Sequence, residues 1–190
     1  MPTRDEALVL MERWVDNEAL RNHMKAVEAA LRSYARRFGE DEELWGLAGL
    51  LHDLDWEKYP AEHPLKAVEE LRARGYPEAV LRAILSHRAD FTGVKPETQL
   101  ERTLVACDEL AGLVNATALV RPNGIDDLAP KSVKKKLKDS TFARGVDRDE
   151  VRQGTELLGI DLDQHIQNVI DAMRSIATEL GISGAQIRGA

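Results

Sequence analysis

The sequence predicts an all-α fold, and three observations carry this prediction. Apolar residues recur at steps of three and four along most of the chain, as they do on one face of a helix. Aromatic residues make up 5% of the chain and runs of Val and Ile are scarce, so the composition disfavours a sheet. No segment alternates convincingly between apolar and polar residues, which is the pattern of a half-buried strand.

Capping residues mark where several of these helices begin and end. Thr3 and Glu6 have the spacing of a capping box, in which each side chain accepts a hydrogen bond from the other residue's backbone N–H. Gly39 can end the second helix, and Asp41 can cap the third. The predicted helices span residues 18–37, 64–74, 77–87, 98–117, 147–158 and 163–180, and two more open at Thr3 and at Asp41. Residues 131–138 form a basic segment.

The length of 190 residues suits one domain with a small appendage. The one plausible boundary is at residues 121–130, where Pro, Gly and Asp indicate a surface connection. We therefore expect a helical core over residues 1–120 and a C-terminal helical subdomain, residues 121–190, packed on that core.

Charge and cysteine content narrow the class of protein. Lys and Arg number 26 and Asp and Glu 33, so the formal charge is −7, which disfavours extended nucleic acid and anionic membranes as partners. Cys107 is the single cysteine, which rules out an intrachain disulfide and a thiolate cluster. The first residues lack the pattern of a signal peptide, and no stretch approaches the ~18 apolar residues of a membrane span. We expect a cytoplasmic protein; its oligomeric state is not readable from the sequence.

Histidines and carboxylates in apolar surroundings suggest a metal site. His23 lies on the second helix near apolar positions, and His52 and His87 stand at or near the ends of apolar helical stripes. Asp53 follows His52, and Asp108 interrupts an apolar run. Because an unpaired buried carboxylate costs several kcal/mol or shifts its pKa, a bound divalent cation would account for both carboxylates.

The order His23, His52-Asp53 and Asp108 resembles the H…HD…D signature of the HD-domain superfamily of metal-dependent phosphohydrolases. The resemblance covers roughly residues 18–120, and the whole chain is similar to a group of short bacterial HD hydrolases. It implies an HD-domain-like helical bundle with a small C-terminal helical extension.

The resemblance also implies ligands for one or two divalent metal ions per chain. His63 and His87 fall where two-metal members of the superfamily carry further histidines. The implied first site comprises His23, His52, Asp53 and Asp108, and the implied second site comprises Asp53, His63 and His87. Nitrogen and oxygen ligands without thiolate suit Mn, Fe, Co, Ni, Zn or hydrated Mg.

The sequence departs from two subclasses of the superfamily, and the second departure bears on the class of substrate. Leu54-Asp55 replaces the Ile-Gly that follows His-Asp in one subclass, so Asp55 is either a further polar site residue or the helix end. Gly75-Tyr76-Pro77 matches the signature of cyclic-dinucleotide phosphodiesterases by letter but lies elsewhere in the chain. Cyclic dinucleotides are therefore not the favoured substrate.

The resemblance implies hydrolysis of a phosphomonoester or nucleotide-type substrate, a small phosphorylated molecule, by a metal-activated water, with Asp53 in the catalytic centre. The nearest cations in the sequence are Lys66, one turn after His63, and Arg88, beside His87. Either these two residues contribute to catalysis and bind phosphate, or they are solvated helix residues. Lys131 and Lys134 either reach toward substrate or form the solvated face of an amphipathic helix.

Two other function classes stay open. Some members of the superfamily use this ligand pattern in di-iron oxygenases, which would require two irons and redox activity. Alternatively, the metal only ties helices together in a non-catalytic binding protein. Two residues outside the motif have simpler expected roles: His165, with polar neighbours, is expected at the surface, and Cys107 is expected to be buried and inert.

Overall fold

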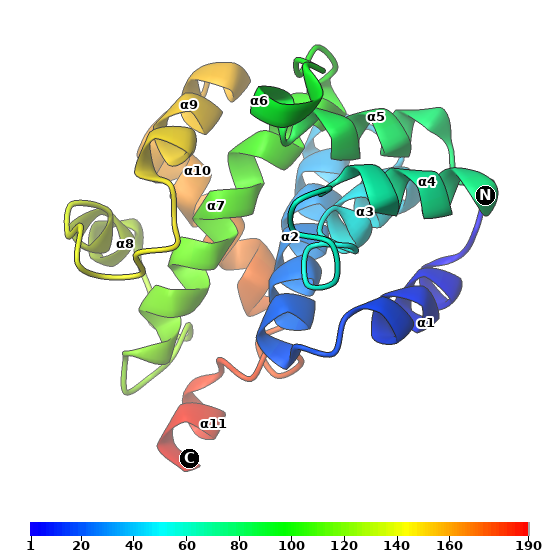
Figure 1. Ribbon diagram of the computed structural model, residues 1–190. Helices are drawn as coiled ribbons and strands as arrows, with labels where there is room; N and C mark the ends of the chain where they lie inside the picture. The colour runs from blue at the N-terminus through cyan, green and yellow to red at the C-terminus, as the bar shows by residue number, and fades with distance from the viewer. Residues whose placement is uncertain (190) are drawn as a thin grey trace. The chain divides into compact units, whose positions relative to one another are not determined.

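The computed structural model describes residues 1–189, and every regular element in that range is a helix (Figure 1). An isolated β-bridge between Gly124 and Ser183 does not extend into a strand. The all-α prediction is therefore confirmed. The helices are α1 (Arg4–Trp14), α2 (Glu18–Phe38), α3 (Glu42–Leu51), α4 (Leu65–Ala73), α5 (Glu78–Ser86), α6 (Ala89–Thr92), α7 (Gln99–Leu119), α8 (Pro130–Leu137), α9 (Arg148–Leu158), α10 (Leu162–Arg174) and α11 (Gly184–Gly189).

The chain divides into two compact units, and the division falls inside α7, after Val105. The first unit contains α1 to α6 and the start of α7, and the second contains the rest of α7 and α8 to α11. The sequence instead predicts a boundary at residues 121–130, in the segment that follows α7. The division into residues 1–120 and 121–190 stays a prediction.

Helix ends in the first unit lie where the capping residues indicate. Thr3 Oγ1 accepts a hydrogen bond from the Glu6 N–H at 3.3 Å, and the Glu6 carboxylate accepts one from the Thr3 N–H at 2.7 Å. Gly39 ends α2 in the left-handed region, with φ of 72°, which glycine adopts without steric cost. The Asp41 carboxylate accepts from two N–H groups in the first turn of α3.

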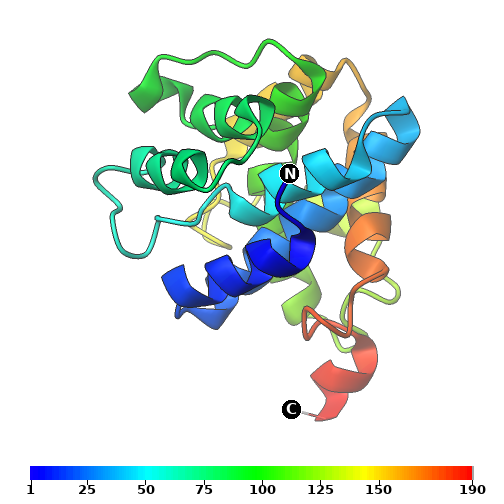
Figure 2. The same ribbon diagram turned by 90° about the vertical axis from the view of Figure 1, so that its right-hand side faces the viewer.

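Helices α2 and α3 pack along each other in the first unit (Figures 1 and 2). Burial of each large apolar side chain between them contributes about 1.5–3 kcal/mol. Large buried apolar side chains on these two helices are Met24, Val27, Leu31, Leu47, Leu50 and Leu51. A Cβ atom at Gly49 would lie 2.8 Å from backbone atoms of Glu28, so glycine is what permits this close approach of α3 to α2.

A buried carboxylate connects the first helices. Glu28 of α2 is almost fully buried and accepts hydrogen bonds from two arginines. The Arg4 guanidinium of α1 binds it through Nε at 2.6 Å and Nη2 at 2.9 Å, and Arg32 Nε lies 2.8 Å from the same carboxylate. Arg32 also pairs with Glu43 of α3. The buried charge is thus paired and hydrogen-bonded, as burial requires.

Helices α4 and α5 lie side by side in both ribbon views (Figures 1 and 2). Pro64 and Pro77 immediately precede them, where the missing proline N–H costs no helical hydrogen bond. The short helix α6 was not predicted: it has four residues, and Gly93 ends it with a φ of 73°. A single turn of this length is too short to show apolar periodicity.

In the second unit, α10 packs against α8 and α9. His165 of α10 is 0% exposed, and its Nε2 donates a hydrogen bond to the Ala106 carbonyl at 2.9 Å. The prediction that His165 lies at the surface is therefore wrong. Most of its sequence neighbours are polar, but residues three and four positions away decide the face of a helix, and Leu162, Asn168 and Val169 share its face.

Helix α10 ends earlier than predicted, at Arg174 instead of near residue 180. Apolar residues continue the helical spacing, but the backbone tightens. The N–H groups of Ile176 and Ala177 bond to carbonyls three residues earlier rather than four. The segment is therefore a series of turns.

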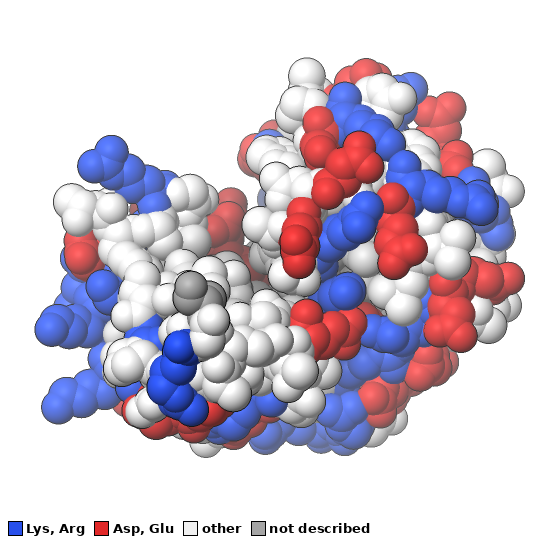
Figure 3. Space-filling model, turned by 90° about the horizontal axis from the view of Figure 1, so that it is seen from below, with Lys and Arg blue, Asp and Glu red and all other residues white. Residues whose placement is uncertain are grey.

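No helix within residues 1–189 is long and apolar enough to cross a membrane. Basic and acidic side chains are interspersed over much of the face shown in Figure 3. Exposed ion pairs include Arg152 with Asp149 and Arg72 with Glu78. Such pairs contribute little to stability, about 0–1 kcal/mol each.

Candidate metal centre

One helix and the ends of three others in the first unit bring four imidazoles around one carboxylate. His23 lies in α2. His52 follows the last residue of α3, and Asp53 follows His52. His63 precedes Pro64 at the start of α4, and the peptide bond between them is cis. His87 follows the last residue of α5. His52, His63 and His87 are buried, whereas His23 and Asp53 are partly exposed.

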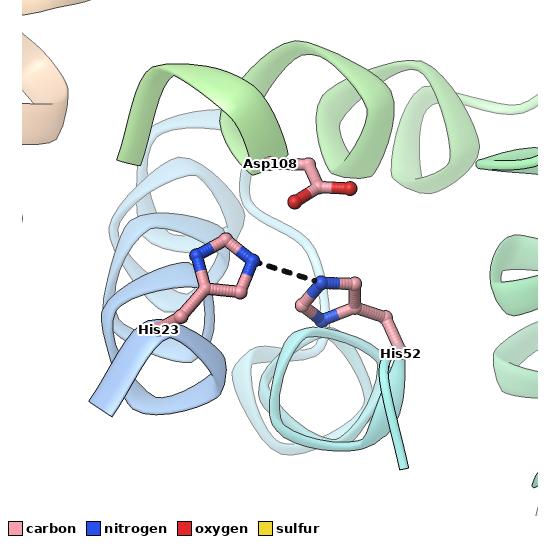
Figure 4. Close-up of side chains that lie close together, drawn as sticks. All are labelled: His23, His52 and Asp108. Carbon is pink, nitrogen blue, oxygen red and sulfur yellow. Dashed lines mark hydrogen bonds between the residues drawn. The ribbon is translucent and has the colours of Figure 1, made fainter. Parts of the chain in front are cut away.

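The first histidine pair faces one oxygen of Asp53. The Nε2 atoms of His23 and His52 lie 3.3 Å apart, and Figure 4 shows both rings with this contact. Asp53 Oδ2 lies 3.8 Å from His23 Nε2 and 3.5 Å from His52 Nε2. Three possible ligand atoms from α2 and the end of α3 therefore converge.

The second histidine pair faces the other oxygen of Asp53. The Nε2 atoms of His63 and His87 lie 3.0 Å apart. Asp53 Oδ1 lies 3.4 Å from His63 Nε2 and 3.6 Å from His87 Nε2. These three residues form a group that could hold a metal ion. Asp53 thus presents one oxygen to each pair of imidazoles.

Hydrogen bonds to the opposite ring nitrogens fix how the imidazoles point. His52 Nδ1 donates to the Gly49 carbonyl at 2.8 Å, and His87 Nδ1 donates to the Ile84 carbonyl. A carbonyl oxygen only accepts, so Nδ1 carries the hydrogen in both rings, and the Nε2 of each neutral ring carries a lone pair. Metal-binding histidines commonly have such an anchor on the other nitrogen.

The chemistry of these groups fits a cation. Around Asp53 Oδ1, the lone pairs of two imidazoles and a carboxylate oxygen point toward one another, and acceptors so placed repel unless a positive charge lies among them. Ligands about 2.1 Å from one ion lie about 3.0–3.4 Å apart in octahedral or tetrahedral geometry. The observed separations of 3.0 and 3.4 Å lie in that range, and the third, 3.6 Å, is slightly longer. Nitrogen and oxygen donors suit Mn, Fe, Co, Ni or Zn, or hydrated Mg.

Asp108, the remaining predicted ligand, lies on α7 in the second unit and is drawn in Figure 4. Its place in the first metal site stays a prediction from the order of the motif. Its neighbour Cys107 is fully buried. Burial, and to a smaller degree the charge of Asp108, raise the pKa of the Cys107 thiol, so this cysteine is not a nucleophile at neutral pH.

The cations predicted to bind phosphate all pair with surface carboxylates where a contact is described. Lys66 Nζ lies 3.0 Å from Glu69 and 3.7 Å from Glu62, and the hydrogen bond that Lys66 donates to Glu69 raises the pKa of Lys66. Arg88 donates to both oxygens of Asp90 at 3.2 Å. Exposed pairs of this kind are weak, so a phosphate can displace the carboxylate.

Two further predicted cations belong to the second unit. Lys131 and Lys134 lie on α8, whose Val133 and Leu137 are buried. Lys134 Nζ lies 2.6 Å from an Asp163 carboxylate oxygen, and Lys131 is exposed. Val133 and Leu137 thus form the buried side of an amphipathic helix, which is one of the two roles considered for this segment. Contact of Lys131 or Lys134 with substrate stays a prediction.

Three further groups lie beside the histidines of the centre, and for one of them, Asp55, the sequence leaves two roles open. Asp55 binds the second nitrogen of His63, and the Gly49 carbonyl binds that of His52. Trp56 is 44% exposed, and its ring centroid lies 5.0 Å from that of His63. For Gly49 a signal existed: a histidine that ends a helix lies three residues after a carbonyl it can reach.

Comparison with known families agrees with this geometry. A family model described as "HD domain" matches residues 20–113. That range contains all six predicted metal ligands. It also contains Asp55, Lys66 and Arg88.

Proposed function

Because the chain belongs to the HD-domain superfamily, we propose that it is a metal-dependent phosphohydrolase that cleaves a phosphomonoester or nucleotide-type substrate. The observation that carries the proposal is the position of Asp53. Its two carboxylate oxygens each face a different pair of imidazole nitrogens, at 3.4 to 3.8 Å. One carboxylate can therefore serve two divalent cations at once.

Bound divalent cations lower the pKa of a coordinated water and neutralise charge on phosphate oxygens. The chain's own groups would hold and orient these ions. His23 and His52 would bind through Nε2 on one side of Asp53, and His63 and His87 on the other. The anchored Nδ1–H groups of His52 and His87 keep each ring from rotating away.

Lys66 and Arg88 complete the proposed centre. Each follows a predicted ligand closely in sequence: Lys66 lies in the first turn of α4 after His63, and Arg88 adjoins His87. In the proposal they exchange their surface carboxylate partners for the phosphate of the substrate. Arg88 presents a planar guanidinium that matches two phosphate oxygens, and Lys66 acts as a point charge.

The test combines phosphatase activity with metal content in three proteins: the wild type, Asp53→Ala and a matched control, Asp149→Ala. Asp149 is an exposed carboxylate on α9 that pairs with Arg152. We expect Asp53→Ala to lose both metal retention and hydrolysis of a generic phosphomonoester, and Asp149→Ala to keep both. Full activity of Asp53→Ala at the wild-type metal load would refute the proposal. Two irons without phosphatase activity in the wild type would favour the oxygenase instead.

A further inference from the structure

Asp55 is a buried carboxylate with two hydrogen-bond partners beside the proposed centre. It is 0% exposed and lies two residues after Asp53. Its Oδ1 lies 2.7 Å from His63 Nδ1, and its Oδ2 accepts a hydrogen bond from the Ala67 N–H at 2.8 Å. Both of its oxygens are therefore engaged, one by an imidazole and one by the backbone of α4.

We propose that Asp55 is a positioning residue that sets the tautomer of His63, placing the hydrogen on Nδ1 and leaving Nε2 as the ligand atom. A carboxylate accepts hydrogen bonds at both oxygens and donates none. Since the Ala67 N–H takes Oδ2, the contact at Oδ1 requires a hydrogen on His63 Nδ1. The Nε2 lone pair of His63 then points toward Asp53 Oδ1, 3.4 Å away. This inference rests on the proposed metal centre.

The position of His63 explains why it needs a side chain for this purpose. His52 and His87 each follow the last residue of a helix, and each donates to the carbonyl three residues earlier in that helix. His63 instead precedes α4, so no helix carbonyl lies behind it. The carboxylate of Asp55 takes the place of that carbonyl.

Asp55→Asn is the sharpest variant because an amide cannot satisfy both contacts. If its oxygen accepts from the Ala67 N–H, its NH2 group faces His63 Nδ1, which must then accept and carry no hydrogen. The hydrogen moves to Nε2, and the ligand lone pair is lost. If the amide is flipped, its NH2 group opposes the Ala67 N–H, and two donors meet.

A simpler role for Asp55 would be to cap α4, since Ala67 lies in the first turn of that helix. The two roles predict opposite orders for Asn and Ala. A cap is weakened less by Asn, which keeps an acceptor, than by Ala, which has none. A tautomer-setting residue is impaired by Asn at least as much as by Ala, because Asn actively favours the wrong tautomer.

The experiment uses the full chain as wild type, Asp55→Asn, Asp55→Ala and the surface control Asp149→Asn. Nitrogen-15 NMR of the metal-free proteins at pH 8, where ordinary imidazoles are neutral, reports which His63 nitrogen carries the hydrogen. Titration with Mn²⁺ measures the affinity of each site. We expect Nδ1–H in the wild type and Nε2–H in Asp55→Asn. Second-site affinity should fall about 10–100-fold in Asp55→Asn, and first-site affinity should change little.

Several results would overturn the inference. One is an Nδ1–H tautomer of His63 in Asp55→Asn. Another is wild-type second-site affinity in that variant, and a third is a loss in Asp55→Ala that clearly exceeds the loss in Asp55→Asn. The NMR measurement needs neither metal nor substrate. A wild type that shows the expected tautomers but hydrolyses no phosphoester would refute the proposed function and leave the role of Asp55 intact.

Discussion

Replacing Gly49 with alanine puts a methyl group where α3 meets the backbone of α2. The added Cβ would lie 2.8 Å from the Cα and N atoms of Glu28, whereas ordinary contacts begin near 3.4 Å. Backbone atoms cannot rotate away, so the two helices would have to separate by about 0.6 Å. His23 stands on one of these helices and His52 at the end of the other, and their Nε2 atoms lie 3.3 Å apart.

The expected cost follows from two opposing terms. Overpacking in a tight core costs about 1–3 kcal/mol, and replacing glycine with alanine inside a helix returns about 1 kcal/mol. We expect Gly49→Ala to lower the free energy of unfolding by about 0–2 kcal/mol. Ligating geometry must hold to within about 0.5 Å, so the affinity of the His23–His52 site should fall about tenfold or more.

Gly112→Ala is the matched control, since it makes the same change inside a helix, α7. Its Cβ would meet a side-chain carbon of Val146 at 3.8 Å, an ordinary contact distance. We expect its unfolding free energy to stay within about 1 kcal/mol of the wild type. Urea denaturation of the metal-free proteins and Mn²⁺ titration measure both effects. Equal stability and equal Mn²⁺ affinity of the two variants would show that the close approach at Gly49 does not set the spacing of α2 and α3.

Three other predictions concern the remaining buried groups. Burial lowers the pKa of His165, so below its ordinary value the unfolded chain binds a proton that the folded chain does not. The stability that His165 contributes is therefore complete above about pH 6.5 and falls by about 1.4 kcal/mol per pH unit below it. In urea denaturation between pH 7.5 and 5.5, the unfolding free energy of His165→Gln should depend less on pH than that of the wild type. An unchanged slope would contradict this. Glu28→Ala should lower the unfolding free energy by about 2–3 kcal/mol, because it leaves the guanidinium groups of Arg4 and Arg32 without this partner. The surface control Arg36→Ala should lower it by about 0–1 kcal/mol. Similar losses of stability in thermal unfolding of the two variants would argue against the buried network. His63→Ala should remove the second metal and keep the first, as elemental analysis would show; loss of both would mean that the two sites are not separate.

The sequence predicts helices well here because the local signals act over a few residues. Capping side chains such as Thr3 and Asp41 satisfy backbone groups of the next turn, and Gly39 supplies a positive φ. The end of α10 was missed because apolar spacing continues past Arg174 while the hydrogen-bond pattern changes. The residues near His165 in the sequence are mostly polar and predict an exposed position. The apolar residues on its helix face lie three and four positions away, and they explain why it is buried.

The sequence names the residues proposed as metal ligands, and it does not show which groups hold them in place. The order of His23, His52-Asp53 and Asp108 carries the resemblance, and His63 and His87 follow from the two-metal members. Spacing alone does not reveal which oxygen of Asp53 faces which imidazole pair, since that depends on the packing of α2, α3 and α5. The role of Asp55 was left open because its partner Ala67 contributes only a backbone N–H, which no motif records.

Electron paramagnetic resonance of the Mn²⁺-loaded chain is the most direct test of whether Asp53 joins two metal sites. We expect two Mn²⁺ per chain with an exchange-coupled spectrum, because two ions that share one carboxylate would lie close enough to interact. Asp53→Ala should lose that coupled signal. A wild-type protein that binds a single uncoupled Mn²⁺, or two that show no coupling, would contradict the claim.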